Sequence, residues 1–220
     1  MDKIQEMKRV LDAEFTIKDL GQRTYTLDSL EYAGMLGCQL VSFPMEKNVK
    51  LDKYEGEVMI DVNHYRHLVG RLLYLQSTSP YITYVANVLS QLMSDPCTRQ
   101  LQAANQVLRY LKATPVQGIL LTTNGGSNLI TYCDSDWFGF PMTRMSRTGY
   151  LHILGGSPIS WKSKKQSVGS RSSAEAEYIA ITSNVCEVVW MRWLLKELCM
   201  TFHGQTKLFC DNQACQRNFT

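Results

Sequence analysis

The chain has 220 residues, of which 45% are hydrophobic and 20% are charged, and its formal net charge is +3. This ordinary globular composition excludes intrinsic disorder, collagen and coiled coil as the main description of the protein. The longest apolar stretches, such as residues 188–195, are far shorter than the ~18 residues of a membrane-spanning helix. Five of the first nine residues are charged and no apolar segment follows them, so we expect no secretory signal and no membrane association. The seven cysteines form no CxxC pair and fit a reduced, intracellular setting.

Residues 1–118 are predicted to form a mainly helical segment. Apolar side chains recur there at spacings of three and four, which is typical of the buried face of a helix. Ser79 and Asp95 each precede a proline and divide the helices, because a residue before proline is displaced from the helical conformation. The apolar positions are Ile4, Met7, Val10, Leu11 and Phe15, then Leu68, Leu72 and Leu75, then Ala103, Val107, Leu108 and Leu111.

After Pro115 the pattern changes to short β-rich runs separated by Gly, Asn and Pro. One long helix follows, over about residues 173–198. Ser172 and Glu175 at its start have the spacing of a capping box. We predict a mixed α/β sheet covered by this helix over residues 119–220. The predicted strands are residues 118–123, 129–134, 148–154, 159–162 and 207–211.

Two acidic residues lie at the end of the strand predicted from residue 129. Alternation places Ile130, Tyr132, Asp134 and Asp136 on one face, so that acids follow two large side chains. An acid in this place either has a function or simply reaches solvent where the strand ends. Asp211 ends the last predicted strand in the same way, although it could instead cap a following helix.

Glu175 and Glu177 differ in their expected roles because they point to different sides of the long helix. The capping box explains Glu175. Glu177 aligns with Ile181, Val185 and Val188, the apolar stripe expected to pack on the sheet. A buried carboxylate is costly unless it is paired or binds a cation. The alternative is an acid in the first helical turn that is favoured by the helix dipole.

Asp134, Glu177 and Asp211 together suggest an enzyme. Two strand ends and a buried helix face each deliver one carboxylate, and hard oxygen ligands of this kind suit Mg²⁺, which binds carboxylates and substrate phosphates together. Phosphodiester hydrolysis is therefore the leading hypothesis. An acid-free basic run nearby is either a solvated face or a contact for a phosphate backbone, and it consists of Lys162, Lys164, Lys165 and Arg171.

The sequence also resembles a known family. Five motifs closely resemble the ribonuclease H domain of copia-type retrotransposon Pol polyproteins, and segments upstream resemble the region between polymerase and ribonuclease H in the same polyproteins. The resemblance implies a ribonuclease H-like fold, a place within a longer Pol polyprotein, and location in a cytoplasmic retrotransposon particle or in the nucleus. The motifs are TYCDSDWFG (131–139), TRMSRTGY (143–150), ISWKSKKQ (159–166), SRSSAEAEYIA (170–180) and LFCDNQA (208–214).

The resemblance implies roles for individual residues. Asp134, Glu177 and Asp211 match the family's metal-binding catalytic acids, which hold two Mg²⁺ ions, with Mn²⁺ as a substitute. Asp136 and Ser173 match supporting positions beside them. The implied reaction is hydrolysis of the RNA strand of an RNA–DNA hybrid. The four basic residues 162, 164, 165 and 171 would contact the phosphates of the hybrid without sequence preference.

Several departures from the family pattern support a second interpretation. The family has a fourth acidic residue beyond the position of Thr220, so we expect a ribonuclease H-like domain that is incomplete at its C-terminus. Residues 18–21 lead directly into Gln22 without the family's β-hairpin, as if it had been deleted. The polymerase's paired aspartates are absent, which excludes DNA polymerisation by this chain alone. The alternatives to an enzyme are an inactive retroelement remnant with at most weak nucleic-acid binding, and an interaction module.

Overall fold

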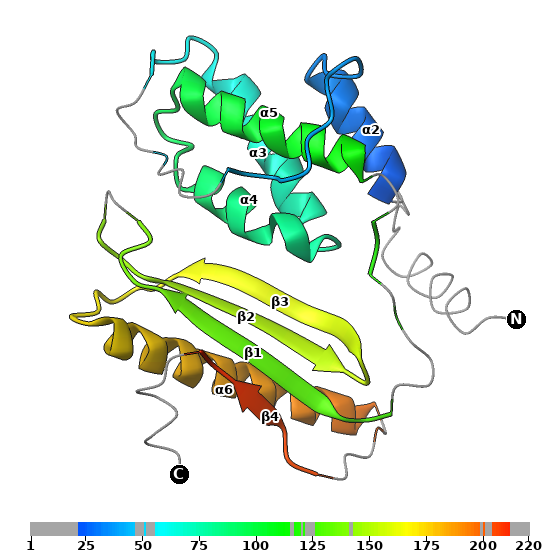
Figure 1. Ribbon diagram of the computed structural model, residues 1–220, viewed down its shortest axis with the longest axis vertical. Coiled ribbons are helices and arrows are strands. Elements are labelled where there is room, and N and C mark those ends of the chain that lie inside the picture. The colour runs from blue at the N-terminus through cyan, green and yellow to red at the C-terminus, as the bar shows by residue number, and fades with distance from the viewer. Residues whose placement is uncertain are drawn as a thin grey trace, which may run out of the picture.

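The computed structural model describes residues 22–46, 51, 56–114, 117–119, 121, 126–140, 143–198, 200 and 204–211, except for the side chains of residues 22–24. The helix predicted within residues 4–15 lies outside these ranges. Figure 1 shows three layers: a group of helices, a four-stranded sheet, and one long helix on the opposite face of the sheet. The predicted α/β fold with a preceding helical segment is confirmed. None of the described helices combines the length and apolar character that crossing a membrane requires.

The helical group packs around leucines that the sequence pattern identifies. Leu68, Leu72 and Leu108 are fully buried in one apolar cluster. The hydroxyl of Tyr65, also fully buried, donates a hydrogen bond of 2.9 Å to the carbonyl oxygen of Leu89. This cluster contains no residue of the sheet, so the helical group has a core of its own. Its elements are α2 (Gln22–Tyr32), α3 (Val62–Leu75), the 3-10 turn η1 (Pro80–Ile82), α4 (Thr83–Ser90) and α5 (Thr98–Ala113).

The sheet has the order β3-β2-β1-β4. The first three strands form an antiparallel meander, whereas β4 is parallel to β1. Residues 118, 119 and 121 lie in no strand, so the strand predicted over 118–123 is wrong there; β2 and β4 already occupy both edges of β1. The strands are β1 (Leu129–Asp136), β2 (Arg147–Leu154), β3 (Ser157–Lys165) and β4 (Lys207–Phe209).

The long helix α6 (Ser173–Glu197) connects β3 to β4 and begins where the capping box predicts. The Ser172 hydroxyl accepts a hydrogen bond from the Glu175 amide, and the Glu175 carboxylate accepts one from the Arg171 amide. The predicted buried stripe is correct except at Val185, which is 44% exposed. Asn184 occupies that place instead, because a helix turn of 3.6 residues brings it over the sheet. Its side-chain oxygen accepts a hydrogen bond of 3.0 Å from the Thr131 hydroxyl.

The helical group lies against the face of the sheet that α6 leaves open (Figure 1). Trp161 on β3 connects the two: its indole N–H donates a 2.8 Å hydrogen bond to the carbonyl oxygen of Gln76, just after α3. Arg147 on β2 similarly donates to the carbonyl oxygen of Tyr84 on α4, at 3.5 Å. The polar contacts of β2 and β3 therefore fix the helical group on the sheet.

Replacing Trp161 with phenylalanine tests this junction. The variant keeps the aromatic ring and loses the bond to Gln76, so we expect the free energy of unfolding to fall by about 1 kcal/mol. Urea denaturation of the two proteins measures the difference. Trp193→Phe is the matched control, because Trp193 is 69% exposed on α6. Equal loss of stability in both variants would contradict the proposed junction.

Candidate metal centre

Asp134 lies near the end of β1, on the face of the sheet opposite α6. The burial of β1 alternates as predicted: Thr131 and Cys133 are buried beneath α6, whereas Tyr132 and Asp134 are exposed. In the register of the sheet, Asp134 lies opposite Gly149 of β2, which has no side chain to cover the carboxylate. The strand therefore presents this acid to a ligand.

Glu177 approaches the same place from α6. Its side chain is only 4% exposed, and its Oε1 atom accepts a hydrogen bond of 3.2 Å from the Ser135 amide of β1. The other oxygen, Oε2, is buried and has no hydrogen-bond partner among the described residues. Glu175, two positions earlier, is exposed and belongs to the capping box. The two glutamates thus occupy different environments, as the helix geometry predicts.

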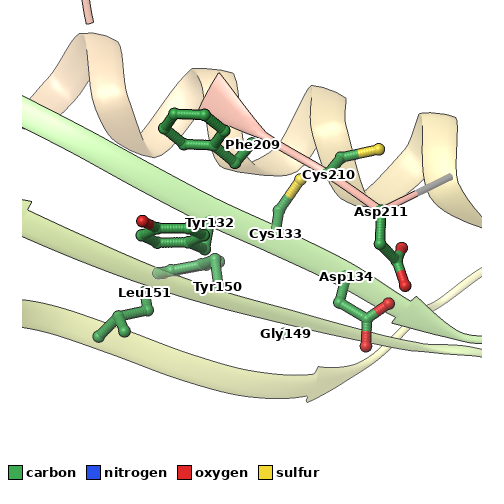
Figure 2. A pocket seen from close by; sticks show the side chains of 9 residues that line it. All are labelled: Tyr132, Cys133, Asp134, Gly149, Tyr150, Leu151, Phe209, Cys210 and Asp211. Atoms are coloured by element: carbon green, nitrogen blue, oxygen red, sulfur yellow. The ribbon is translucent and has the colours of Figure 1, made fainter. Parts of the chain in front are cut away.

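Asp211 completes the cluster because β4 runs parallel to β1. Phe209 pairs with Tyr132, so Asp211, two residues further on, comes beside Asp134. One carboxylate oxygen from each of Asp134, Glu177 and Asp211 lies within 4.8 Å of the others. Figure 2 shows the Asp211 side chain directed toward the carboxylate of Asp134. The alternative of Asp211 as a helix cap concerns residues after 211, which lie outside the described ranges.

The electrostatics of the cluster favour a cation. Burial, with Asp134 next in importance, raises the pKa of Glu177 to about 7, although the Ser135 amide opposes this. Burial and then Asp211 raise the pKa of Asp134. Mg²⁺ holds oxygen ligands at about 2.1 Å, so oxygens on one ion lie about 3 to 4 Å apart. The three carboxylate oxygens, within 4.8 Å of one another, are near this spacing. The residues therefore fit a divalent cation, which would also take up the unpaired Oε2 of Glu177.

A groove of about 480 Å³ runs from the carboxylates along β1 and β4 (Figure 2). Its lining includes Tyr132 and Phe209, which are 46% and 45% exposed. Their rings are stacked, with centroids 5.2 Å apart and planes at 21°. The groove thus offers flat apolar surface at one end and carboxylates at the other.

The other predicted residues lie apart from the three acids. Asp136 is half-buried, outside the group of three, and a side chain on Gly139 would collide with its carboxylate. Ser173 is the exposed first residue of α6. The supporting roles of Asp136 and Ser173 stay predictions.

The four basic residues do not form a single cluster beside the acids. Lys162 makes a 3.3 Å ion pair with Glu187 of α6. Lys162 and Lys164 flank Ser163, which is two strands from Asp134 in the register of the sheet, or about 10 Å. Alternation turns Lys165 to the opposite face of β3, and Arg171 is exposed in the loop before α6.

Sequence reasoning missed the residues that hold α6 in place. The Gln166 side chain is buried and donates hydrogen bonds to the Ala176 carbonyl oxygen and the Thr148 hydroxyl, at 3.0 and 3.1 Å. Its own oxygen accepts a bond from Ser170. These bonds anchor the first turn of α6 and with it Glu177. The position of Gln166 at the end of a matched motif was the only signal for it in the sequence.

The fold and the three convergent carboxylates define a ribonuclease H-like α/β protein with a candidate divalent-cation site. Sequence comparison identifies its relatives. The chain is 42% identical over 193 residues to the retrovirus-related Pol polyprotein from transposon RE1 of Arabidopsis thaliana. The matched region is 88% of this chain and 13% of the relative. The chain is 32% identical over 203 residues to the Pol polyprotein from transposon TNT 1-94 of Nicotiana tabacum, 89% of this chain and 15% of the relative.

A third relative is an uncharacterized mitochondrial protein of Arabidopsis thaliana, 38% identical over 175 residues, 78% of this chain and 71% of the relative. The chain belongs to the family of retrovirus-related Pol polyproteins from copia-type transposons, and the resemblance drawn from the motifs is confirmed. It spans about one eighth of the Pol polyprotein from RE1. No protein-family model matches the chain, and no solved structure does.

Proposed function

We propose that this retrotransposon-derived chain hydrolyses the RNA strand of RNA–DNA hybrids, with Mg²⁺ held by Asp134, Glu177 and Asp211. The observation that carries the proposal is the meeting of three carboxylates, one of them buried with an unpaired oxygen. Bound Mg²⁺ activates water and stabilises the charge that develops on phosphate oxygens. Mn²⁺ is the expected substitute.

The residues of the chain have distinct tasks in this proposal. The Ser135 amide orients Glu177 by holding Oε1, which leaves the buried Oε2 available to bind a cation. Asp134 and Asp211 are exposed, line the groove and would hold the cation. Burial of Glu177 strengthens its attraction for the cation, because charges interact more strongly away from water.

The hybrid would lie across the open groove. Tyr132 and Phe209 supply a stacking surface for base or sugar rings. Lys165, on the same face of the sheet as Asp134, and Arg171, exposed before α6, would meet phosphates beyond the cleaved bond with salt-sensitive and sequence-independent affinity. Lys162 and Lys164, in contrast, lie on the face that α6 covers. The partner proposed for the chain is thus an RNA–DNA hybrid, met as part of a longer Pol polyprotein.

A cleavage assay tests the proposal. The purified chain is incubated with an end-labelled hybrid in Mg²⁺ and in Mn²⁺, beside the same RNA alone and a DNA duplex of the same sequence. We expect fragments of the RNA strand from the hybrid only, and none with a chelator. A chain that is folded by circular dichroism yet cleaves nothing in either metal would be an inactive remnant. Equal cleavage of the free RNA would contradict hybrid recognition.

Removing the aromatic pair should weaken binding of the hybrid. Tyr132→Ala with Phe209→Ala deletes both rings, and stacking on one base contributes about 1 to 3 kcal/mol, so we expect affinity to fall about 10-fold or more. Fluorescence anisotropy with labelled hybrid in Ca²⁺, which binds carboxylates and which we expect not to support cleavage, measures this change. Tyr81→Ala is the control, because Tyr81 is similarly exposed (53%) but lies in the helical group. Unchanged affinity in the double variant would show that the groove does not hold the hybrid.

A further inference from the structure

A second cavity, of about 280 Å³, lies between α4 and the open face of the sheet. Its sheet side includes Arg147 of β2 and Ser163 of β3, and its helix side includes Thr83 and Tyr84 of α4. Of the residues that line this cavity, the proposed reaction uses only Asp134. The cavity is notable for the buried polar atoms on its walls that have no partners among the described residues.

Arg147 is the main one of these groups. Its side chain is 2% exposed, and the guanidinium carbon lies 4.4 Å from the ring centre of Tyr84 and 4.3 Å from that of Phe140. The two rings hold the guanidinium plane in place, and Nη1 donates to the Tyr84 carbonyl oxygen. Nε and Nη2 have no partner in the described chain. These two atoms form the edge of the guanidinium that grips two oxygens of one anion.

Two hydroxyl groups on the cavity walls also lack a hydrogen-bond partner among the described residues. Thr83 and Ser163 are 8% and 9% exposed, and neither hydroxyl oxygen has a partner among the described residues. Together with Arg147 they present donors and contain no obligatory acceptor. Burying such donors without acceptors costs free energy, so the set suits a ligand with several acceptor oxygens. A phosphate group has this chemistry, and its negative charge would balance the positive charge of the buried guanidinium.

We propose that this cavity binds a phosphate group, which the Nε and Nη2 atoms of Arg147 grip side-on and the hydroxyls of Thr83 and Ser163 orient. The site adjoins the three carboxylates, because Asp134 lines both, but its binding groups are other residues and their role does not depend on hydrolysis. Its ligand is either free phosphate or a backbone phosphate of a nucleic acid.

The cavity wall also holds groups that act on an anion. Lys162 adds positive charge, although its ammonium is engaged with Glu187. Asp134 and Asp136 add negative charge. Asp134 belongs to the carboxylate cluster, so a bound cation would neutralise it. Asp136 faces Arg147 across the β1–β2 pairing, but its carboxylate lies against Gly139. The competing account is that Asp136 turns and pairs with Arg147 itself.

Nuclear magnetic resonance of the arginine Nε–H groups in the full chain tests the proposal. Inorganic phosphate is titrated at constant ionic strength, and Arg147→Lys identifies the signal of Arg147. We expect a saturable shift of this signal. Arg144, exposed three residues earlier, is the control: Arg144→Lys should leave the shift of the Arg147 signal unchanged. In a second arm, a short RNA–DNA hybrid in Ca²⁺ replaces phosphate. A shift with the hybrid but not with phosphate assigns the ligand to a nucleic-acid backbone, and the reverse assigns it to free phosphate.

Two further variants keep the test decisive if Arg147→Lys does not fold. Thr83→Val with Ser163→Ala retains Arg147 and removes the hydroxyls, and we expect phosphate affinity to fall about 10-fold. Asp136→Asn should leave the unliganded Arg147 signal in place and should not weaken phosphate binding. No saturable shift in either arm would overturn the proposal. A large movement of the unliganded signal in Asp136→Asn would also overturn it, because Arg147 would then be paired with Asp136.

Discussion

Glu177→Gln should reduce Mg²⁺-dependent cleavage of an RNA–DNA hybrid by about 1,000-fold or more. Glutamine has nearly the same shape and can still accept the hydrogen bond from Ser135, so the fold should be retained. It lacks the negative charge that completes the site, and metal ions contribute several kcal/mol to stabilising the transition state. Initial rates with labelled hybrid measure the loss.

Glu175→Gln is the matched control for this prediction. It makes the same chemical change two residues away on α6, where the side chain is exposed and belongs to the capping box. Glutamine also serves in a capping box, so α6 should keep its start. We expect cleavage by Glu175→Gln to match that of the unaltered chain. Equal loss in both variants would indicate damage to the helix, and full activity of Glu177→Gln would remove Glu177 from the reaction.

The same substitution should stabilise the metal-free protein at pH 8, by up to about 3 kcal/mol. Burial raises the pKa of Glu177 from 4.5 in its ordinary state to about 7. Between these values the unfolded chain has lost the proton and the folded chain retains it. Stability of the unaltered protein therefore falls as the pH rises from about 4.5 to 7. Glutamine has no proton to lose, so the variant should not show this part of the pH dependence.

Urea denaturation from pH 4 to 8 in the presence of a chelator measures this effect. The two proteins should have similar stability at pH 4 and diverge as the pH increases. Added Mg²⁺ at pH 8 should stabilise the unaltered chain and leave Glu177→Gln unchanged, because a ligand stabilises only the state that binds it. A variant less stable than the unaltered chain at pH 8 would show that the ionised carboxylate is satisfied by the fold itself.

Local sequence signals predicted much of the fold. The capping box at Ser172 and Glu175 gave the first residue of α6, because a helix start depends on hydrogen bonds within four residues. Alternation gave the faces of β1, because it too depends only on neighbouring residues of the chain. The predicted strand over 118–123 and the burial of Val185 were wrong. Both depend on which strands and faces are already occupied, and that is decided by partners far away in the sequence.

At the candidate site, too, local features were predictable and features set by distant partners were not. Asp134, Glu177 and Asp211 could be selected individually from the ends and faces of their elements. Their convergence required the parallel pairing of β1 with β4, which the sequence motifs implied only through the family resemblance. The ion pair of Lys162 with Glu187 was not predictable, since it joins an edge strand to a helix across the sheet. Arg147 lies in a matched motif, but its surroundings were not predictable, because its aromatic neighbours come from α4 and from the loop before β2.

Calorimetric titration of the metal-free chain with Mg²⁺ at pH 8 tests most directly whether the three carboxylates form a metal site. We expect saturable binding in the unaltered chain and in Glu175→Gln, and binding about 10-fold weaker or absent in Asp134→Asn and Glu177→Gln. Binding that is unaffected by Asp134→Asn and Glu177→Gln would place the ion elsewhere. A folded chain that takes up no Mg²⁺ would contradict the metal centre and, with it, the proposed hydrolysis.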